Sequence, residues 1–177
     1  MNNRSPSFPD SLVRKYGTRD PFQIARMAGI TVKFINTKKQ KGFCRIILNN
    51  AFIFISRNMS EQMQKMTCAH ELGHLFLHRD VLTSREFLLE YELFDIRSDT
   101  ELEANVFAAR LLIDEEELLE LLGTGADMVS IASALNINVN LLMIRLIEMQ
   151  KRGYTFAIPF TPDRKFLRRI RDRAGSI

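Results

Sequence analysis

The sequence predicts an α+β fold with a small antiparallel sheet, a long central helix and a C-terminal helical extension. Three observations support this prediction. Residues 30–56 are rich in β-branched and aromatic residues, residues 61–78 and 101–122 are predicted helices, and residues 127–152 contain two short helical stretches. The chain has 177 residues, of which 46% are hydrophobic, and these values suit one globular domain.

The N-terminal part predicts a capped helix followed by strands. Asp20 is a preferred N-cap residue, and Pro21 suits the first position of a helix. Asn49 and Asn50 separate the last two strands, and two such residues are typical of a tight hairpin because asparagine tolerates positive φ. Strands are predicted at 30–35, 43–48 and 51–56.

Helices dominate the remainder of the chain. Ser60 can cap the helix at 61–78, and the helix at 101–122 is predicted to break near Asp114. The polar, partly acidic stretch at 79–100 gives no clear pattern beyond some helical character. Asp127 then begins the first of two short helices, at 127–135 and 141–152.

All three histidines of the chain lie within nine residues, as His70, His74 and His78. Residues 70–74 read His-Glu-Leu-Gly-His, which is an H-E-x-x-H motif. On a helix, His70 and His74 project from one face and can bind one zinc ion, about one per chain. Glu71 lies beside them and is placed to act as a general base toward water rather than as a ligand. His78 is about 12 Å from His70 along the helix, too far to share a metal with both.

With no histidine left, a carboxylate is the expected third ligand, and residues 101–113 offer Glu101 and Glu103. Glu103 begins an apolar row with Phe107 and Leu111, and a carboxylate on such a row needs a partner such as a metal. Glu101 begins a row with Asn105, which suggests a wetter face. We therefore prefer Glu103, with Glu101 as the alternative.

Three segments carry a family resemblance. His-Glu-Leu-Gly-His at 70–74, Glu-Ala-Asn-Val-Phe-Ala-Ala-Arg-Leu-Leu-Ile at 103–113 and the segment at 15–25 together resemble the ImmA/IrrE family of metallo-endopeptidases. The resemblance implies a zincin-like fold, with Glu103 as the third zinc ligand. It also implies that the substrate is a DNA-binding repressor of the helix-turn-helix type, in a bacterial or phage setting. One departure is Ile113-Asp114, where the family commonly has Met-Pro.

These observations predict a zinc-dependent endopeptidase. Residues 1–125 would form the zincin-like metallopeptidase domain, and residues 126–177 a helical extension with a basic tail, packed on the same domain. Tyr91 and Arg110 are both candidates to stabilise the oxyanion, and the sequence does not choose between them. The alternative is a non-catalytic, transcription-related binding protein with a structural or sensing zinc site. A closed metal site would favour that alternative, since catalytic sites keep a position open.

Charge and composition bear on partners and location. The net charge is +4, residues 86–120 hold twelve acids against two arginines, and six of the ten residues at 164–173 are Lys or Arg. We expect this tail to lie on the acidic part or in solvent, and direct nucleic-acid binding is the less favoured alternative. The second helix of the 127–152 pair is too apolar to read DNA and is expected to pack. The start of the chain has no signal-peptide pattern, no apolar run is long enough to span a membrane, and Cys44 and Cys68 are expected to be free thiols, so a cytoplasmic location is predicted.

Overall fold

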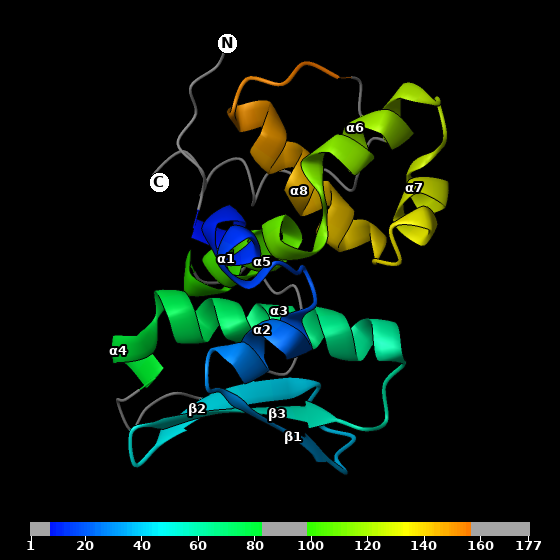
Figure 1. Cartoon of the computed structure of the whole chain (residues 1–177). Helices are drawn as coiled ribbons and strands as arrows, with labels where there is room; N and C mark the ends of the chain where they lie inside the picture. The colour runs from blue at the N-terminus through cyan, green and yellow to red at the C-terminus, as the bar shows by residue number, and fades with distance from the viewer. Residues whose placement is uncertain (1–7, 83–98, 157–177) are drawn as a thin grey trace.

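A three-stranded sheet forms one layer of the molecule, and helices are stacked above one of its faces (Figure 1). The computed structural model describes residues 8–82 and 99–156. The elements in chain order are α1 Phe8–Tyr16, α2 Pro21–Met27, β1 Thr31–Ile35, β2 Gly42–Ile47, β3 Asn50–Ser56, α3 Glu61–Leu77, α4 Arg79–Leu82, α5 Asp99–Leu112, α6 Glu115–Gly123, α7 Met128–Ala134 and α8 Val139–Lys151. The predicted α+β class is confirmed.

Polar side chains at the helix starts explain most of the helix boundaries. Asp20 accepts hydrogen bonds from the backbone amides of α2, and Ser60 accepts one from α3, as predicted. Asp114 accepts from two amides of α6 and so divides the predicted 101–122 helix into α5 and α6. Asp127 and Asn138 cap α7 and α8 in the same way.

The sheet is mixed rather than antiparallel. Its strand order is β1-β3-β2; β2 and β3 form the predicted antiparallel hairpin, whereas β1 pairs with β3 in parallel. The hairpin turn lies one residue earlier than predicted, because Leu48 and Asn49 have positive φ angles of 48° and 63°. Ile47 pairs with Asn50 and closes the turn. Because the strand order is β1-β3-β2, strand β2 is one edge of the sheet.

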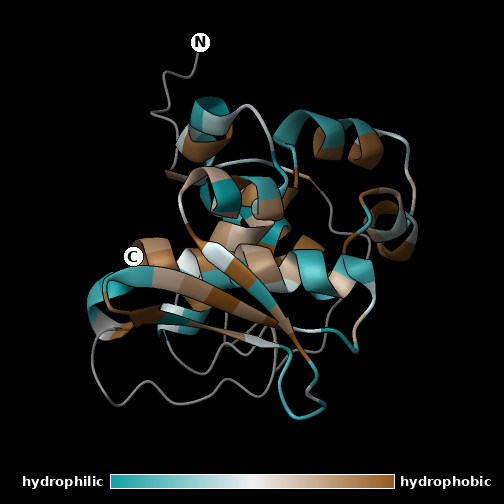
Figure 2. Ribbon diagram, turned by 60° about the horizontal axis from the view of Figure 1, so that its bottom comes forward, coloured by the Kyte–Doolittle hydropathy of each residue, from teal (hydrophilic) through white to brown (hydrophobic). Residues whose placement is uncertain are grey.

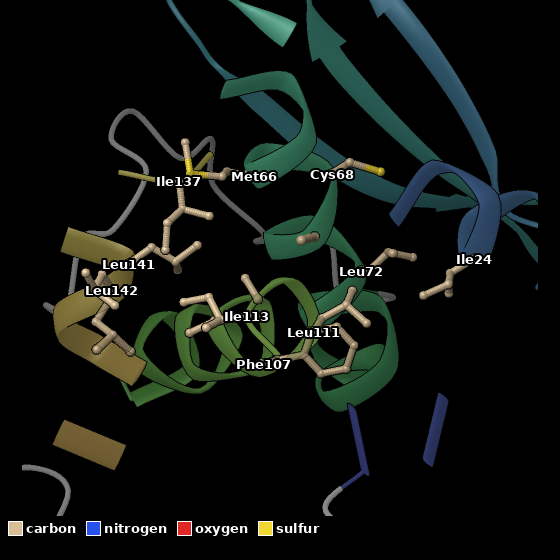
Figure 3. Close-up of a cluster of buried hydrophobic side chains, with 14 of the residues drawn as sticks. Ile24, Met66, Cys68, Leu72, Phe107, Leu111, Ile113, Ile137, Leu141 and Leu142 are labelled. Carbon is tan, nitrogen blue, oxygen red and sulfur yellow. The ribbon is translucent and has the colours of Figure 1, made fainter. Parts of the chain in front are cut away.

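The helix α3 crosses the inner face of the sheet, α5 packs on α3, and α8 packs on α5. Figure 3 shows apolar side chains of the core that these helices share with α2, including Leu72 of α3, which lies beside Ile24 of α2, Phe107 of α5 and Leu141 of α8. The crossing of α3 and α5 is close: a β-carbon added to Gly73 would lie 3.0 Å from the Cα atom of Ala104. This crossing brings the histidine motif next to the start of α5.

The helix α8 is a packing element, as predicted. Most of its side chains are buried, and Arg145 among them is only 1% exposed. The Arg145 guanidinium is paired with Glu115 at 2.8 Å and with Glu148 at 2.5 Å. Within the described part of the chain, no single helix is long and apolar enough to cross a membrane; α7 and α8 reach that length and composition only as a pair, with a bend of 101° between them.

Candidate metal centre

The two histidines of the motif meet in the interior of the protein. His70 and His74 lie one turn apart on α3, and both side chains are completely buried. Their Nε2 atoms are 3.1 Å apart, and their ring centroids are 4.7 Å apart. Two buried imidazole nitrogens at this distance converge on one point, as ligands of a single cation do.

Asn105 of α5 sets the orientation of the first histidine. Its Oδ1 atom lies 2.9 Å from Nδ1 of His70, and the Asn105 side chain is also fully buried. Because a carbonyl oxygen only accepts, Nδ1 of His70 carries the proton and Nε2 keeps its lone pair. This is the tautomer that binds a metal through Nε2, and an outer partner of this kind is usual for a metal-binding histidine.

Glu101 brings a carboxylate to the same point. Its Oε2 atom is 3.3 Å from Nε2 of His70, and its Oε1 atom is 3.4 Å from Nε2 of His74. Ligand atoms of all three residues lie within 4.8 Å of one another. Glu101 and Asn105 are one turn apart on α5, so both face the histidines.

Glu103, preferred from the sequence as the third ligand, does not take that position. Its Oε2 atom lies 2.7 Å from Nε2 of His78, the residue that caps the C-terminus of α3. Two residues advance a helix by about 200°, so Glu101 and Glu103 project from different sides of α5. The Glu103 side chain is 38% exposed, so it does not face the interior as expected, and it pairs with His78 rather than with the cluster of His70, His74 and Glu101.

Glu71 is buried on the side of α3 that faces the sheet. Its side chain is 1% exposed, and a β-carbon at Gly42 of strand β2 would lie 3.5 Å from its Oε1 atom. The same β-carbon would collide with the Thr67 side chain at 2.4 Å, so only glycine permits this approach of β2 to α3. The Glu71 carboxylate therefore lies between the histidine helix and the edge strand.

Other polar residues singled out in the sequence lie apart from this cluster or outside the described residues. Arg110 is paired with Asp10 at 2.8 Å and with Glu148 at 2.9 Å, so its charge is used in packing rather than at the histidines. Tyr91 lies outside the described residues. Cys44 and Cys68 are buried free thiols, and burial, followed by the charge of Glu71, raises the pKa of Cys68 well above its usual value.

The donor set suits a zinc ion. Two neutral imidazoles and one carboxylate are the protein ligands of one common class of catalytic zinc site. A histidine binds a metal in its neutral form, through the ring nitrogen that keeps its lone pair. Among the described residues, His70, His74 and Glu101 are the group of metal-binding side chains that converges in this way.

Comparison with known proteins agrees with this geometry. Residues 25–146 match the peptidase M78 family, described as the IrrE N-terminal-like domain, and that family is a metallopeptidase family. The chain is also 34% identical over 105 residues to an uncharacterized immunity region protein 2 of Bacillus phage phi105. That alignment covers 59% of this chain and 65% of the phage protein, so just under two thirds of the relative is spanned. Because the family match covers most of the chain, including α3 and α5, the protein belongs to the peptidase M78 family of IrrE N-terminal-like domains.

Proposed function

We propose that this protein is a zinc-dependent endopeptidase in which His70, His74 and Glu101 hold one zinc ion per chain and Glu71 is the general base. The observation that carries the proposal is the convergence within 4.8 Å of three donor groups from two helices, two buried histidines and a largely buried carboxylate. The carboxylate of the motif itself, Glu71, remains outside this group. An H-E-x-x-H peptidase requires both roles, because its two histidines bind the metal and its glutamate acts as the general base.

When bound, zinc supplies Lewis acidity toward water and the scissile carbonyl. The remaining chemistry belongs to residues of the chain. Glu71 accepts a proton from the attacking water and later donates it to the leaving amine. Asn105 keeps His70 in the tautomer that presents its Nε2 lone pair, and burial of the cluster strengthens each electrostatic interaction there.

The proposed substrate is a repressor-type regulator of a phage, mobile element or stress response. The support is the resemblance to the ImmA/IrrE peptidases and the name of the phage relative, which assigns that protein to an immunity region. We propose that the reaction takes place in the cytoplasm, where the two free thiols stay reduced.

The test compares Glu71→Gln with the wild type on a repressor encoded beside the gene. The variant keeps size and shape but cannot take a proton, so cleavage should fall by about 10²–10⁴-fold while zinc content is retained. Glu120→Gln makes the same chemical change at an exposed position of α6 and should cleave normally. Cleavage and metal content are measured on the same samples.

Undiminished cleavage by zinc-loaded Glu71→Gln would contradict the assigned base. A wild-type protein that holds zinc but cleaves no neighbouring regulator would favour the non-catalytic, transcription-related binding protein instead. The two outcomes are distinct, because the first concerns one residue and the second the whole activity.

A further inference from the structure

The outer face of the sheet carries three phenylalanine rings that the core does not use. Strand alternation turns Ala51, Ile53 and Ile55 of β3 inward, and places Phe52 and Phe54 on the opposite face. The register pairs Phe43 of the edge strand with Phe54, so the third ring lies on that outer face too. All three rings are partly exposed.

The three rings form one continuous aromatic row across two neighbouring strands. The centroids of Phe43 and Phe54 are 4.7 Å apart with planes inclined by 18°, and those of Phe52 and Phe54 are 6.2 Å apart at 24°. Helices α2 and α3 lie on the other side of the sheet (Figure 1), and Figure 2 brings the strands toward the viewer. Among the described residues, therefore, these rings pack mainly on one another.

Positive charge surrounds this row. The register pairs Lys33 of β1 with Phe54 and Arg45 of β2 with Phe52, and both basic side chains are exposed. The Arg45 guanidinium lies 5.8 Å from the centre of the Phe43 ring. Residues 21–60, which hold the whole sheet, contain no Asp or Glu, and their basic residues are Arg26, Lys33, Lys38, Lys39, Lys41, Arg45 and Arg57.

A ligand that matches this surface combines a chain of negative charges with planar apolar groups. Single-stranded nucleic acid has both, because its phosphates attract lysine and arginine while its unpaired bases stack on aromatic rings. Two aromatic residues at i and i+2 on one strand, with a third on the neighbouring strand, is also how sheet-based RNA-binding domains present their stacking rings. A duplex hides its bases, and an acidic protein has no such planar groups in series.

We propose that the outer face of the sheet, defined by Lys33, Phe43, Arg45, Phe52 and Phe54, binds single-stranded nucleic acid. This surface lies on the side of the sheet opposite α3 and the metal cluster. The inference does not depend on peptidase activity.

The experiment measures fluorescence anisotropy of labelled 12-mers of oligo(dT) and oligo(U) with the full chain over a range of salt concentrations. Both oligonucleotides carry phosphates and unpaired bases. The one that binds more tightly shows whether the ligand is DNA or RNA. Phe54→Leu keeps an apolar side chain but removes the ring, and should weaken binding by about 5- to 150-fold without changing the salt dependence.

The double variant Lys33→Gln/Arg45→Gln changes only exposed charges. It should lower the slope of log affinity against log salt by about 1.4, the value for two lost phosphate contacts on a single strand. Arg14→Gln/Lys15→Gln removes two exposed charges from α1 instead and should bind as the wild type does.

The proposal is overturned if neither 12-mer binds saturably at low salt. It is equally overturned if both face variants bind as tightly as the wild type, since binding would then come from another part of the chain. Tighter binding of duplex DNA, polyglutamate or phosphatidylserine vesicles than of single strands would assign the surface to a different partner. Circular dichroism of each variant confirms that the comparison is between folded proteins.

Discussion

Glu101 and Glu103 are two positions apart on α5 and reach different histidines of α3. If Glu101 is the third ligand, Glu101→Ala should lower zinc affinity by several orders of magnitude, because a three-ligand site keeps only two protein donors. Glu103→Ala should leave zinc affinity within about tenfold, since its carboxylate contacts His78 and not the cluster. Competition titration against a chelating dye measures both values. The reverse order would restore Glu103 as the ligand.

The residues of the site could be predicted only in part. The i, i+4 spacing was sufficient to bring His70 and His74 to one face of a helix. The choice between the two glutamates was not predictable from polarity, because Asn105 suggested a wet face and is in fact fully buried against His70. A buried functional face can be as polar as an exposed one. The feature of the sequence that indicated Glu101 was its i, i+4 spacing from Asn105, which places both side chains on one face of α5.

At the scale of elements, the α3–α5 crossing depends on Gly73. Alanine is the better helix former by about 1 kcal/mol, yet a β-carbon here would lie 3.0 Å from Cα and 3.1 Å from the carbonyl oxygen of Ala104. These are backbone atoms, so the helices must separate. We expect Gly73→Ala to lower the free energy of unfolding by about 1–3 kcal/mol, measured in urea.

The matched control is Gly123→Ala at the end of α6. A β-carbon there would meet nothing within 4 Å, so the substitution should be neutral or stabilising by up to about 1 kcal/mol. Equal effects of the two substitutions would show that the crossing tolerates an extra methyl group.

Local rules predicted the helices well, and non-local pairing less well. Asp20, Ser60 and Asp127 cap helices through hydrogen bonds within three residues, and such contacts can be inferred from the sequence alone. The parallel pairing of β1 with β3 depends on which strand takes the centre of the sheet, and no local pattern specifies that order. The hairpin turn was displaced by one residue because Leu48, rather than Asn50, adopts positive φ.

At the scale of the whole molecule, ion pairs link separate helices. Glu115 of α6 pairs with Arg145 of α8 and with Arg152, which follows α8. Burial by itself raises the pKa of Glu115, but hydrogen bonds from Arg152 and Tyr154 lower it more strongly. The nearby charges of Arg145 and Arg152 act in the same direction, and the pKa falls from 4.5 to about 2. A carboxylate with a depressed pKa stabilises the fold fully above its unfolded pKa.

This stabilisation should therefore be complete above about pH 4.5 and disappear as the pH falls toward 2. Urea unfolding at pH 7 and pH 3 tests it by comparing the wild type with Glu115→Gln. The wild type should be the more stable at pH 7, and the difference should shrink at pH 3. A difference that stays constant with pH would contradict the role of the Glu115 charge, and Glu117→Gln, an exposed carboxylate on the same helix, is the control.

The contact between Gly73 and Ala104 has a thermodynamic consequence for the cluster beside it. No side chain longer than a methyl group separates the two helices there, so contact between their backbones sets their spacing. The donors on α3 and α5 lose their freedom relative to each other when the chain folds. We expect a metal ion bound there to restrict little further motion, so that little of its interaction free energy with the three side chains is spent on ordering them. Small zinc modules differ, because they remain unfolded until the metal orders their ligands.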